Sequence, residues 1–124
     1  MPRLDRLDGR YAVARLAADA PEPDWVRGDI VAVTRTPDEL SIACAEDAVP
    51  DDVRAERGFR CLRVEGPIEF TATGVLHSLL QPLADAGISI FAVSTYDTDY
   101  IFVPDGDLDR ALGALRVAGH SVSG

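Results

Sequence analysis

Residues 94–99 place several chemically active side chains between two apolar runs. In order, they are Ser94, Thr95, Tyr96, Asp97, Thr98 and Asp99. A plain hairpin turn would use Asn-Gly or Asp-Gly instead. The two carboxylates suit an ammonium or another cationic group, and the aromatic ring could pack against an apolar stem. The alternative is structural: Asp97 and Asp99 hydrogen-bond their own backbone to shape the turn, and Tyr96 is a packing ring.

The composition narrows the kind of ligand that such a segment could recognise. The chain has 124 residues, 47% of them apolar, which fits one compact domain or two very small ones. Its net charge is −9, and its 12 basic residues are all arginines scattered along the chain. A nucleic-acid reader needs a basic stripe to displace phosphate counterions, so we expect no nucleic-acid partner. No run reaches the roughly 18 apolar residues of a membrane span, and the N-terminus has no apolar signal-peptide core. We expect a cytoplasmic protein.

The residue types that carry most enzyme chemistry are sparse. Cys44 and Cys61 each lie in an alternating apolar run, which predicts two free, buried thiols. His77 and His120 have no metal-ligand spacing, and both are expected on the surface. Lys and Asn are absent, and no nucleophile is paired with a histidine. We therefore expect no metal, no cofactor and no catalytic activity.

The second half of the chain predicts a βαββαβ order. Phe59 to Glu65 alternates as a strand does, and Gly66-Pro67 ends it. Leu76, Leu79, Leu80 and Leu83 then share one helical face, with Thr71 or Thr73 as the cap, Pro82 inside and Gly87 at the end. The later elements are strands at 88–94 and 100–103, a helix from Asp105 or Asp107 to Gly119, and a short strand at 121–122.

The first half repeats part of this order with an offset of sixty residues. Ile30 to Thr34 matches Ile90 to Ser94, and in both places a polar turn and a second apolar strand follow. The segment between the strand at 10–16 and Ile30 has room for only a turn or two of helix. We predict two tandem repeats at 8–57 and 58–124, the first with shortened helices, both built on antiparallel sheets with helices on one face.

Three stretches resemble the small two-repeat ACT-domain proteins of prokaryotes, which are related to the ACT domains of CASTOR-type arginine sensors. They read VTRTPDELSIAC, RCLRVEGPIEF and LADAGISIFAVSTYDTDYIFV. The resemblance covers nearly the whole chain and implies the ferredoxin-like βαββαβ ACT fold of the α+β class. It also implies a regulatory sensor that binds a small molecule, most often an amino acid. The regulated enzyme would be a separate protein of unknown identity.

The resemblance implies a ligand site between two segments. One is the loop before the first helix of the second repeat, and the other is the turn at 94–99. Free N–H groups at a helix start suit a ligand carboxylate, whereas acidic side chains suit its ammonium. The loop offers no Asp or Asn in the short pattern that many ACT loops carry. The predicted ligand-binding residues are Ile68, Glu69, Phe70, Thr71, Thr73, Ser94, Thr95, Tyr96, Asp97, Thr98 and Asp99.

Simpler interpretations of these residues stay open. Thr71 or Thr73 could be a plain helix cap, Glu69 a solvated acid, and Arg60 and Arg63 partners of nearby acids. The whole chain could also be a structural module that docks a protein partner and binds no metabolite. Residues 88–94 are apolar on both parities, which predicts that both faces of that strand are covered. Two half-domains that share a sheet edge, or a second chain, would supply that cover. Because the first repeat is too short to cover much, we expect a homodimer.

Overall fold

The computed structural model describes residues 2–67 and 74–123, and the chain folds as two units. One unit joins residues 1–8 to residues 60–124 and is called here the discontinuous unit. The other consists of residues 9–59 and is called the inserted unit. Strand β5 (Ala55–Val64) gives its first part to the inserted unit and its last part to the discontinuous one. No helix in the described ranges is long and apolar enough to cross a membrane.

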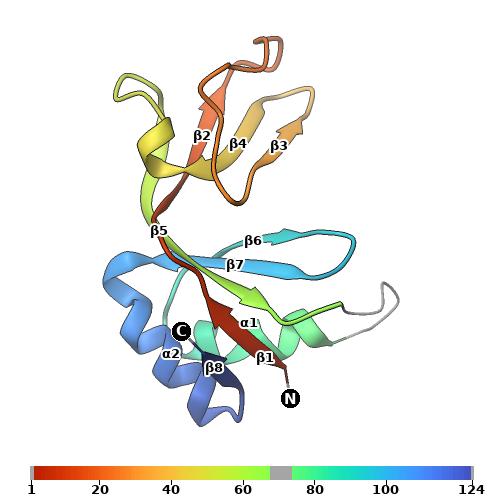
Figure 1. Cartoon of the computed structure of the whole chain (residues 1–124), viewed down its shortest axis with the longest axis vertical. Coiled ribbons are helices and arrows are strands. Elements are labelled where there is room, and N and C mark those ends of the chain that lie inside the picture. The colour runs from red at the N-terminus through yellow and green to blue at the C-terminus, as the bar shows by residue number, and fades with distance from the viewer. Residues whose placement is uncertain (1, 68–73, 124) are drawn as a thin grey trace. The chain divides into compact units, whose positions relative to one another are not determined.

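The discontinuous unit confirms the predicted βαββαβ order (Figure 1). After β5 come helix α1 (Val75–Asp85), strands β6 (Phe91–Ser94) and β7 (Asp99–Pro104), helix α2 (Leu108–Val117) and strand β8 (Ser121–Ser123). Strand β6 is shorter than predicted because Ile88 takes part in the hydrogen-bonded motif that follows α1. There its N–H donates to the carbonyl of Leu83.

Strand β1 (Arg3–Arg6) joins this sheet and was not predicted. It pairs antiparallel with β5 and parallel with β8, so the strand order is β8-β1-β5-β7-β6. The expectation of purely antiparallel sheets is therefore wrong for the β1–β8 pair. Because β1 lies between β5 and β8, these first and last strands of the βαββαβ order do not pair with each other. They still run in opposite directions.

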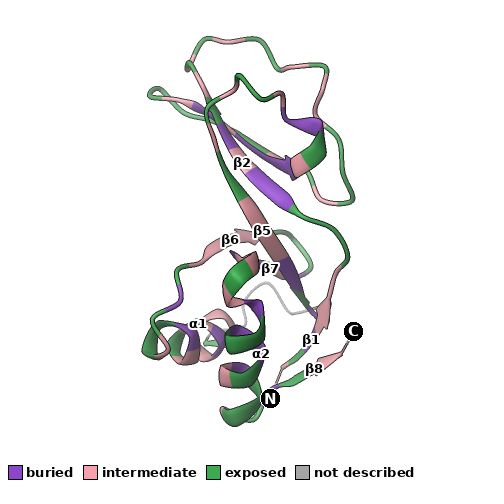
Figure 2. Ribbon diagram, turned by 90° about the vertical axis from the view of Figure 1, so that its left-hand side faces the viewer, coloured by how far each residue is buried: buried purple, intermediate pink, exposed green. Residues whose placement is uncertain are grey.

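The core of the discontinuous unit lies between its sheet and its two helices. The strand residues that face this core are Leu4, Leu62, Val64, Ile101 and Val103. The helix residues that face it are Leu79, Leu83, Ala111, Leu112 and Leu115. Alternate strand residues point to opposite faces, and these strand residues therefore share one face. Their exposed fractions are 1% or less. Figure 2 shows the buried segments on the inner sides of α1 and α2. Each fully buried Leu or Ile contributes about 1.5–3 kcal/mol.

Both helices end in the same hydrogen-bonded motif at the predicted glycines. Gly87 and Gly119 have φ values of 73° and 98°, in the left-handed region that favours glycine. Their N–H groups donate to Ala84 and Arg116, and the following residues donate to Leu83 and Leu115. This pattern of two reversed bonds is the Schellman motif, which satisfies the last carbonyls of a helix.

The helix starts agree only in part with the predicted caps. Gly74 is the N-cap residue of α1, whereas Thr71 and Thr73 lie outside the described residues. Asp107 does occupy the N-cap position of α2, but it makes no side-chain capping bond. Its carboxylate instead accepts a hydrogen bond from the Arg110 guanidinium at 3.1 Å.

Pro82 lies inside α1, and a buried histidine compensates for it. The proline has no N–H to donate to the carbonyl of Ser78, four residues earlier. His120 Nε2 lies 2.9 Å from that carbonyl oxygen and donates to it. A carbonyl only accepts, so Nε2 carries the proton. His120 is 3% exposed, and the expectation that it lies on the surface is wrong. Its role as a donor to the helix explains why it is buried.

The inserted unit is a small sheet with its own core. Its strands are β2 (Tyr11–Leu16), β3 (Ala32–Arg35), β4 (Leu40–Ala45) and the first part of β5, in the order β3-β4-β2-β5. All three ladders are antiparallel. The core contains Ala12, Ala14, Leu40, Ile42, Cys44, Ala48 and Val49, and Trp25 and Val26 of the preceding loop pack on it.

The helix expected between the first two strands of this unit does not form. The residues before Pro21 and Pro23 are restricted to extended conformations, which excludes an α-helix there. The unit's single helical turn is the 3₁₀ helix η1 (Glu46–Ala48). After it, the Arg57 guanidinium donates to the carbonyls of Val49, Pro50 and Val53. That side chain fixes the loop that leads into β5.

The two cysteines are free and buried, as predicted. Each is fully shielded, at 0% exposure. Burial raises the pKa of the Cys61 thiol to about 12, because desolvation disfavours the thiolate. Burial also raises the pKa of Cys44. Since the thiolate is the nucleophilic form, neither residue is suited to react in the folded protein.

Candidate functional site

The hydroxyl groups of residues 94–99 mostly hold the β6–β7 turn together. Thr95 N–H and Thr95 Oγ1 both donate to the carbonyl of Thr98, and Thr98 N–H donates to Thr95 Oγ1. Ser94 Oγ donates to Asp99 Oδ1 at 2.6 Å, across the pair where β6 and β7 meet. These bonds account for the Ser94 and Thr95 hydroxyl groups and for the Asp99 carboxylate.

Thr98 also fastens the turn to the end of β5. Its hydroxyl donates to the carbonyl of Val64 at 2.6 Å, and the residue is 9% exposed. Sequence positions 34 residues apart are thereby brought together. The bond sets the turn beside Gly66-Pro67, which follow the end of β5.

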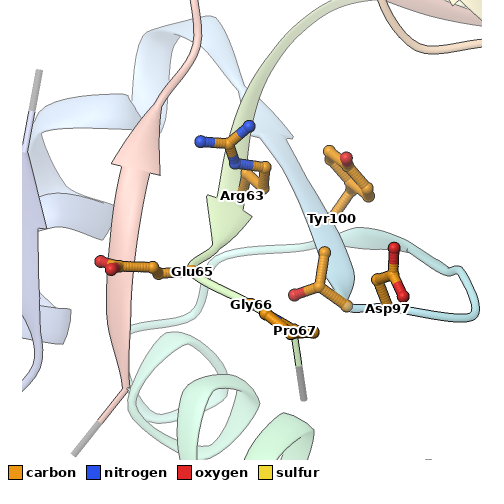
Figure 3. Close-up of a pocket in the computed structure, with 7 residues that line it drawn as sticks. Arg63, Glu65, Gly66, Pro67, Asp97 and Tyr100 are labelled. Carbon is orange, nitrogen blue, oxygen red and sulfur yellow. The ribbon is translucent and has the colours of Figure 1, made fainter.

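A cavity of about 440 Å³ lies between these segments. It is lined by Arg63, Glu65, Gly66, Pro67, Asp97, Thr98 and Tyr100. Figure 3 shows Arg63 on β5 and Tyr100 on β7, with Asp97 on the turn. The volume falls within the roughly 300–1,000 Å³ typical of small-molecule sites.

Two of the charged side chains at this cavity are already paired with β1. Arg63 Nη2 lies 2.8 Å from Asp5 Oδ2, and Glu65 lies 3.1 Å from the Arg3 guanidinium. Ser123 Oγ also donates to Asp5 at 2.6 Å. The bonds from Ser123 and Arg63 lower the pKa of Asp5, and the bond to Asp5 raises the pKa of Arg63. Arg63 is thus held in place as a permanent cation, and its other N–H groups make no hydrogen bond within residues 2–67 and 74–123.

Asp97 and Tyr100 differ from these paired groups. Across residues 2–67 and 74–123, the Asp97 carboxylate and the Tyr100 hydroxyl make no hydrogen bond or ion pair. The cavity therefore offers one uncommitted carboxylate, one phenol and the spare donors of Arg63. In the same ranges, no group of three His, Cys, Asp or Glu side chains could hold a metal ion.

The structure separates the predicted site residues into three groups. Asp97 and Thr98 line the cavity. Tyr96 is 80% exposed, and the described residues of the lining do not include Tyr96, Ser94, Thr95 or Asp99. Five predicted residues lie outside the described residues: Ile68, Glu69, Phe70, Thr71 and Thr73.

Sequence reasoning missed part of the lining, chiefly Arg63, Glu65 and Tyr100. Arg63 and Glu65 alternate with the buried Leu62 and Val64, so the strand pattern does place them together on the opposite face. The alternation identified the face of β5 that carries Arg63 and Glu65. It did not show that the β6–β7 turn lies beside that face. The expectation that Arg60 and Arg63 pair with nearby acids is confirmed, with Asp105 and Asp5 as the partners.

Replacing Thr98 by valine tests the bond that positions the turn. Valine keeps the shape but removes the donor, and the Val64 carbonyl loses its side-chain partner. We expect the free energy of unfolding to fall by about 1–2 kcal/mol, measured by urea denaturation. Thr34→Val is the matched control, because Thr34 is exposed on β3. Equal stability of the two variants would contradict the assigned role.

Two family models match the chain. The model described as an ACT domain matches residues 54–117. A model of an N-terminal domain matches residues 9–52.

Several solved structures resemble the whole chain. A crystal structure of an Agobacterium tumefaciens protein is 43% identical, with a TM-score of 0.92, and the match covers 98% of this chain and 91% of that one. A Vibrio cholerae protein described as a possible transport protein is 20% identical, with a TM-score of 0.76 and coverages of 94% and 89%. The ligand-free regulatory subunit of aspartate kinase from Thermus thermophilus is 12% identical, with a TM-score of 0.62 and coverages of 90% and 93%. The last two likenesses show the fold alone.

Proposed function

This chain belongs to the ACT-domain family, and on that premise we propose that it is a regulatory protein that binds an amino acid. The proposed site is the cavity between the end of β5 and the β6–β7 turn. The observation that carries the proposal is the Asp97 carboxylate, which lines this cavity and has no partner within the described ranges. The shared fold with an aspartate kinase regulatory subunit supports a regulatory role.

The cavity offers a complement for each part of an amino acid. In the proposed complex, Asp97 accepts hydrogen bonds from the ligand ammonium, and the spare N–H groups of Arg63 bind its carboxylate. The Tyr100 ring packs against the ligand's side chain. Arg63 is held by Asp5 before any ligand arrives, so little ordering is required when the carboxylate binds. The proposal includes no reaction and no cofactor.

A thermal-shift screen of the twenty amino acids tests the proposal. A ligand present at 100 times its dissociation constant stabilises the folded protein by about 2.7 kcal/mol, which raises the melting temperature by several degrees. We expect one amino acid, or a few with similar side chains, to raise the melting temperature in this way. If none does, the alternative function is favoured, a module that docks a protein partner.

We also predict a homodimer. Strand β6 pairs only with β7 among the described strands, which leaves its other edge open to a further strand. Phe91 packs on Phe102 at a ring separation of 5.6 Å, but Phe91, Ala92 and Val93 all stay partly exposed. A second copy would cover them and bury on the order of 1,200 Å² or more. Sedimentation at micromolar concentration checks this, and a monomer without concentration dependence would contradict it.

A further inference from the structure

We propose that the inserted unit carries a second small-molecule site, which takes a small zwitterion with one carboxylate and one ammonium group. The site is the face of the β4-β2-β5 sheet opposite the unit's own core. A cavity of about 200 Å³ lies on this face. Side chains from three neighbouring strands and their ends line it, among them Val13, Arg15, Glu39, Ser41, Arg54 and Glu56. This proposal does not depend on the site at the β6–β7 turn.

The strand register places these side chains in rows. Arg15 pairs with Ser41 of β4, and its N–H donates to the carbonyl of Arg54 at 2.9 Å. One row therefore holds a hydroxyl and two guanidinium groups. In the next row, Val13 pairs with Glu56. Residues directly opposite each other in an antiparallel pair share a face, so all of these side chains are on the cavity side.

The charges at this cavity do not neutralise one another. Within the described part of the chain, the side chains of Arg54, Glu39 and Glu56 form no hydrogen bond or ion pair. The Arg15 guanidinium bonds a backbone carbonyl, that of Asp38, at 3.2 Å. Elsewhere in the same unit, Arg27 and Asp47 do form an ion pair at 3.0 Å. Two cations and two anions thus surround one small space with their charges uncommitted.

A zwitterion complements the row of cations and the acid of the adjacent row. Its carboxylate would bind Arg15 and Arg54 with the Ser41 hydroxyl, and its ammonium would bind Glu56. Val13, which pairs with Glu56, supplies an apolar surface beside it. Guanidinium groups on adjacent strands repel each other, and a bound carboxylate relieves that repulsion. The cavity is smaller than the roughly 300–1,000 Å³ of drug-sized sites, which restricts the ligand to a few heavy atoms.

Titration with three small probes tests the inference, followed residue by residue in ¹H–¹⁵N NMR spectra of the full chain. The probes are glycine, acetate and methylammonium, which present both charges, the anion alone and the cation alone. We expect glycine to shift the amides of Arg15, Ser41 and Glu56, with an affinity about tenfold or more above that of either single-charge probe. Both Arg54→Gln and Glu56→Gln are expected to lower the glycine affinity about tenfold.

Matched controls lie in the same unit. Arg27→Gln and Glu22→Gln remove exposed charges outside the cavity and should leave the glycine affinity unchanged. The response should also persist in Asp97→Asn, which keeps it distinct from the site at the β6–β7 turn. Absence of shifts at these three amides would overturn the inference, as would acetate binding as tightly as glycine. A response that disappears in Asp97→Asn, or survives in Arg54→Gln and Glu56→Gln, would overturn it as well.

Discussion

Asp97→Asn is expected to weaken binding of the stabilising amino acid by about tenfold or more. Asparagine keeps the size of the side chain and its turn-forming ability but removes the charge. Hydrogen bonds to a charged group contribute about 1.5–3 kcal/mol, and each 1.4 kcal/mol corresponds to a factor of ten in affinity. Because Asp97 has no partner in the described ranges, the ligand-free protein should keep its melting temperature. Calorimetric titration beside melting curves measures both quantities.

Asp99→Asn provides the matched comparison two residues away. Asp99 accepts the Ser94 hydroxyl at 2.6 Å and is not among the described residues that line the cavity. We expect this variant to lose some stability and to bind with nearly unchanged affinity. If Asp97→Asn binds as well as the wild type, the ligand ammonium does not lie at Asp97. If only Asp99→Asn loses affinity, the ligand instead uses the Ser94–Asp99 pair.

His120→Ala is expected to lower the free energy of unfolding by about 1–3 kcal/mol, with a further loss from the space that the ring vacates. The variant removes the donor that satisfies the Ser78 carbonyl beside Pro82. The effect should depend on the proline. In a Pro82→Ala background, residue 82 gains an N–H that can donate to Ser78, so His120→Ala should cost less there.

A double-mutant cycle measures this dependence through chemical denaturation of the four proteins. We expect a coupling free energy of about 1 kcal/mol or more between positions 82 and 120. His77→Ala is the control, since His77 is exposed on the same helix and should show no coupling to Pro82. Additive effects at positions 82 and 120 would mean that the histidine stabilises the fold by packing alone.

The periodic elements of the fold were predictable, whereas features set by pairing between distant segments were not. Leucines at helical spacing placed α1, alternation placed the last part of β5, and apolar runs after polar turns placed β4 and β7. Strand β1 has only four residues, two of them arginine, and carries too little alternation to be recognised. His120 lies in a short polar segment between α2 and β8. Nothing in that segment indicates that the His120 ring contacts the carbonyl of Ser78, 42 residues earlier.

The candidate site shows the same division. The residue types of the turn pointed to Asp97 and Asp99 alike, because two carboxylates in a short polar segment suit a cationic group of a ligand. The sequence did not show that Asp99 pairs with Ser94 while Asp97 lines the cavity. Predicting that Arg63 and Tyr100 line the cavity would have required knowing that β5 pairs with β7. Their positions at the cavity follow from that pairing and from the bond between Thr98 and Val64. No local pattern reports either contact.

The position of β1 between β5 and β8 bears on how the protein forms during translation. The inserted unit is complete once residue 59 has left the ribosome, whereas β1 waits for β8, near the end of the remaining 65 residues. At about 5–20 residues per second, that delay is roughly 3–13 s. Throughout it, β1 is a strand without its β8 neighbour. Short length and charged side chains such as Arg3, Asp5 and Arg6 are features that discourage unpaired strands from joining other chains. The charged residues that leave β1 without a clear strand pattern are thus also the ones that disfavour its pairing with other chains during this delay.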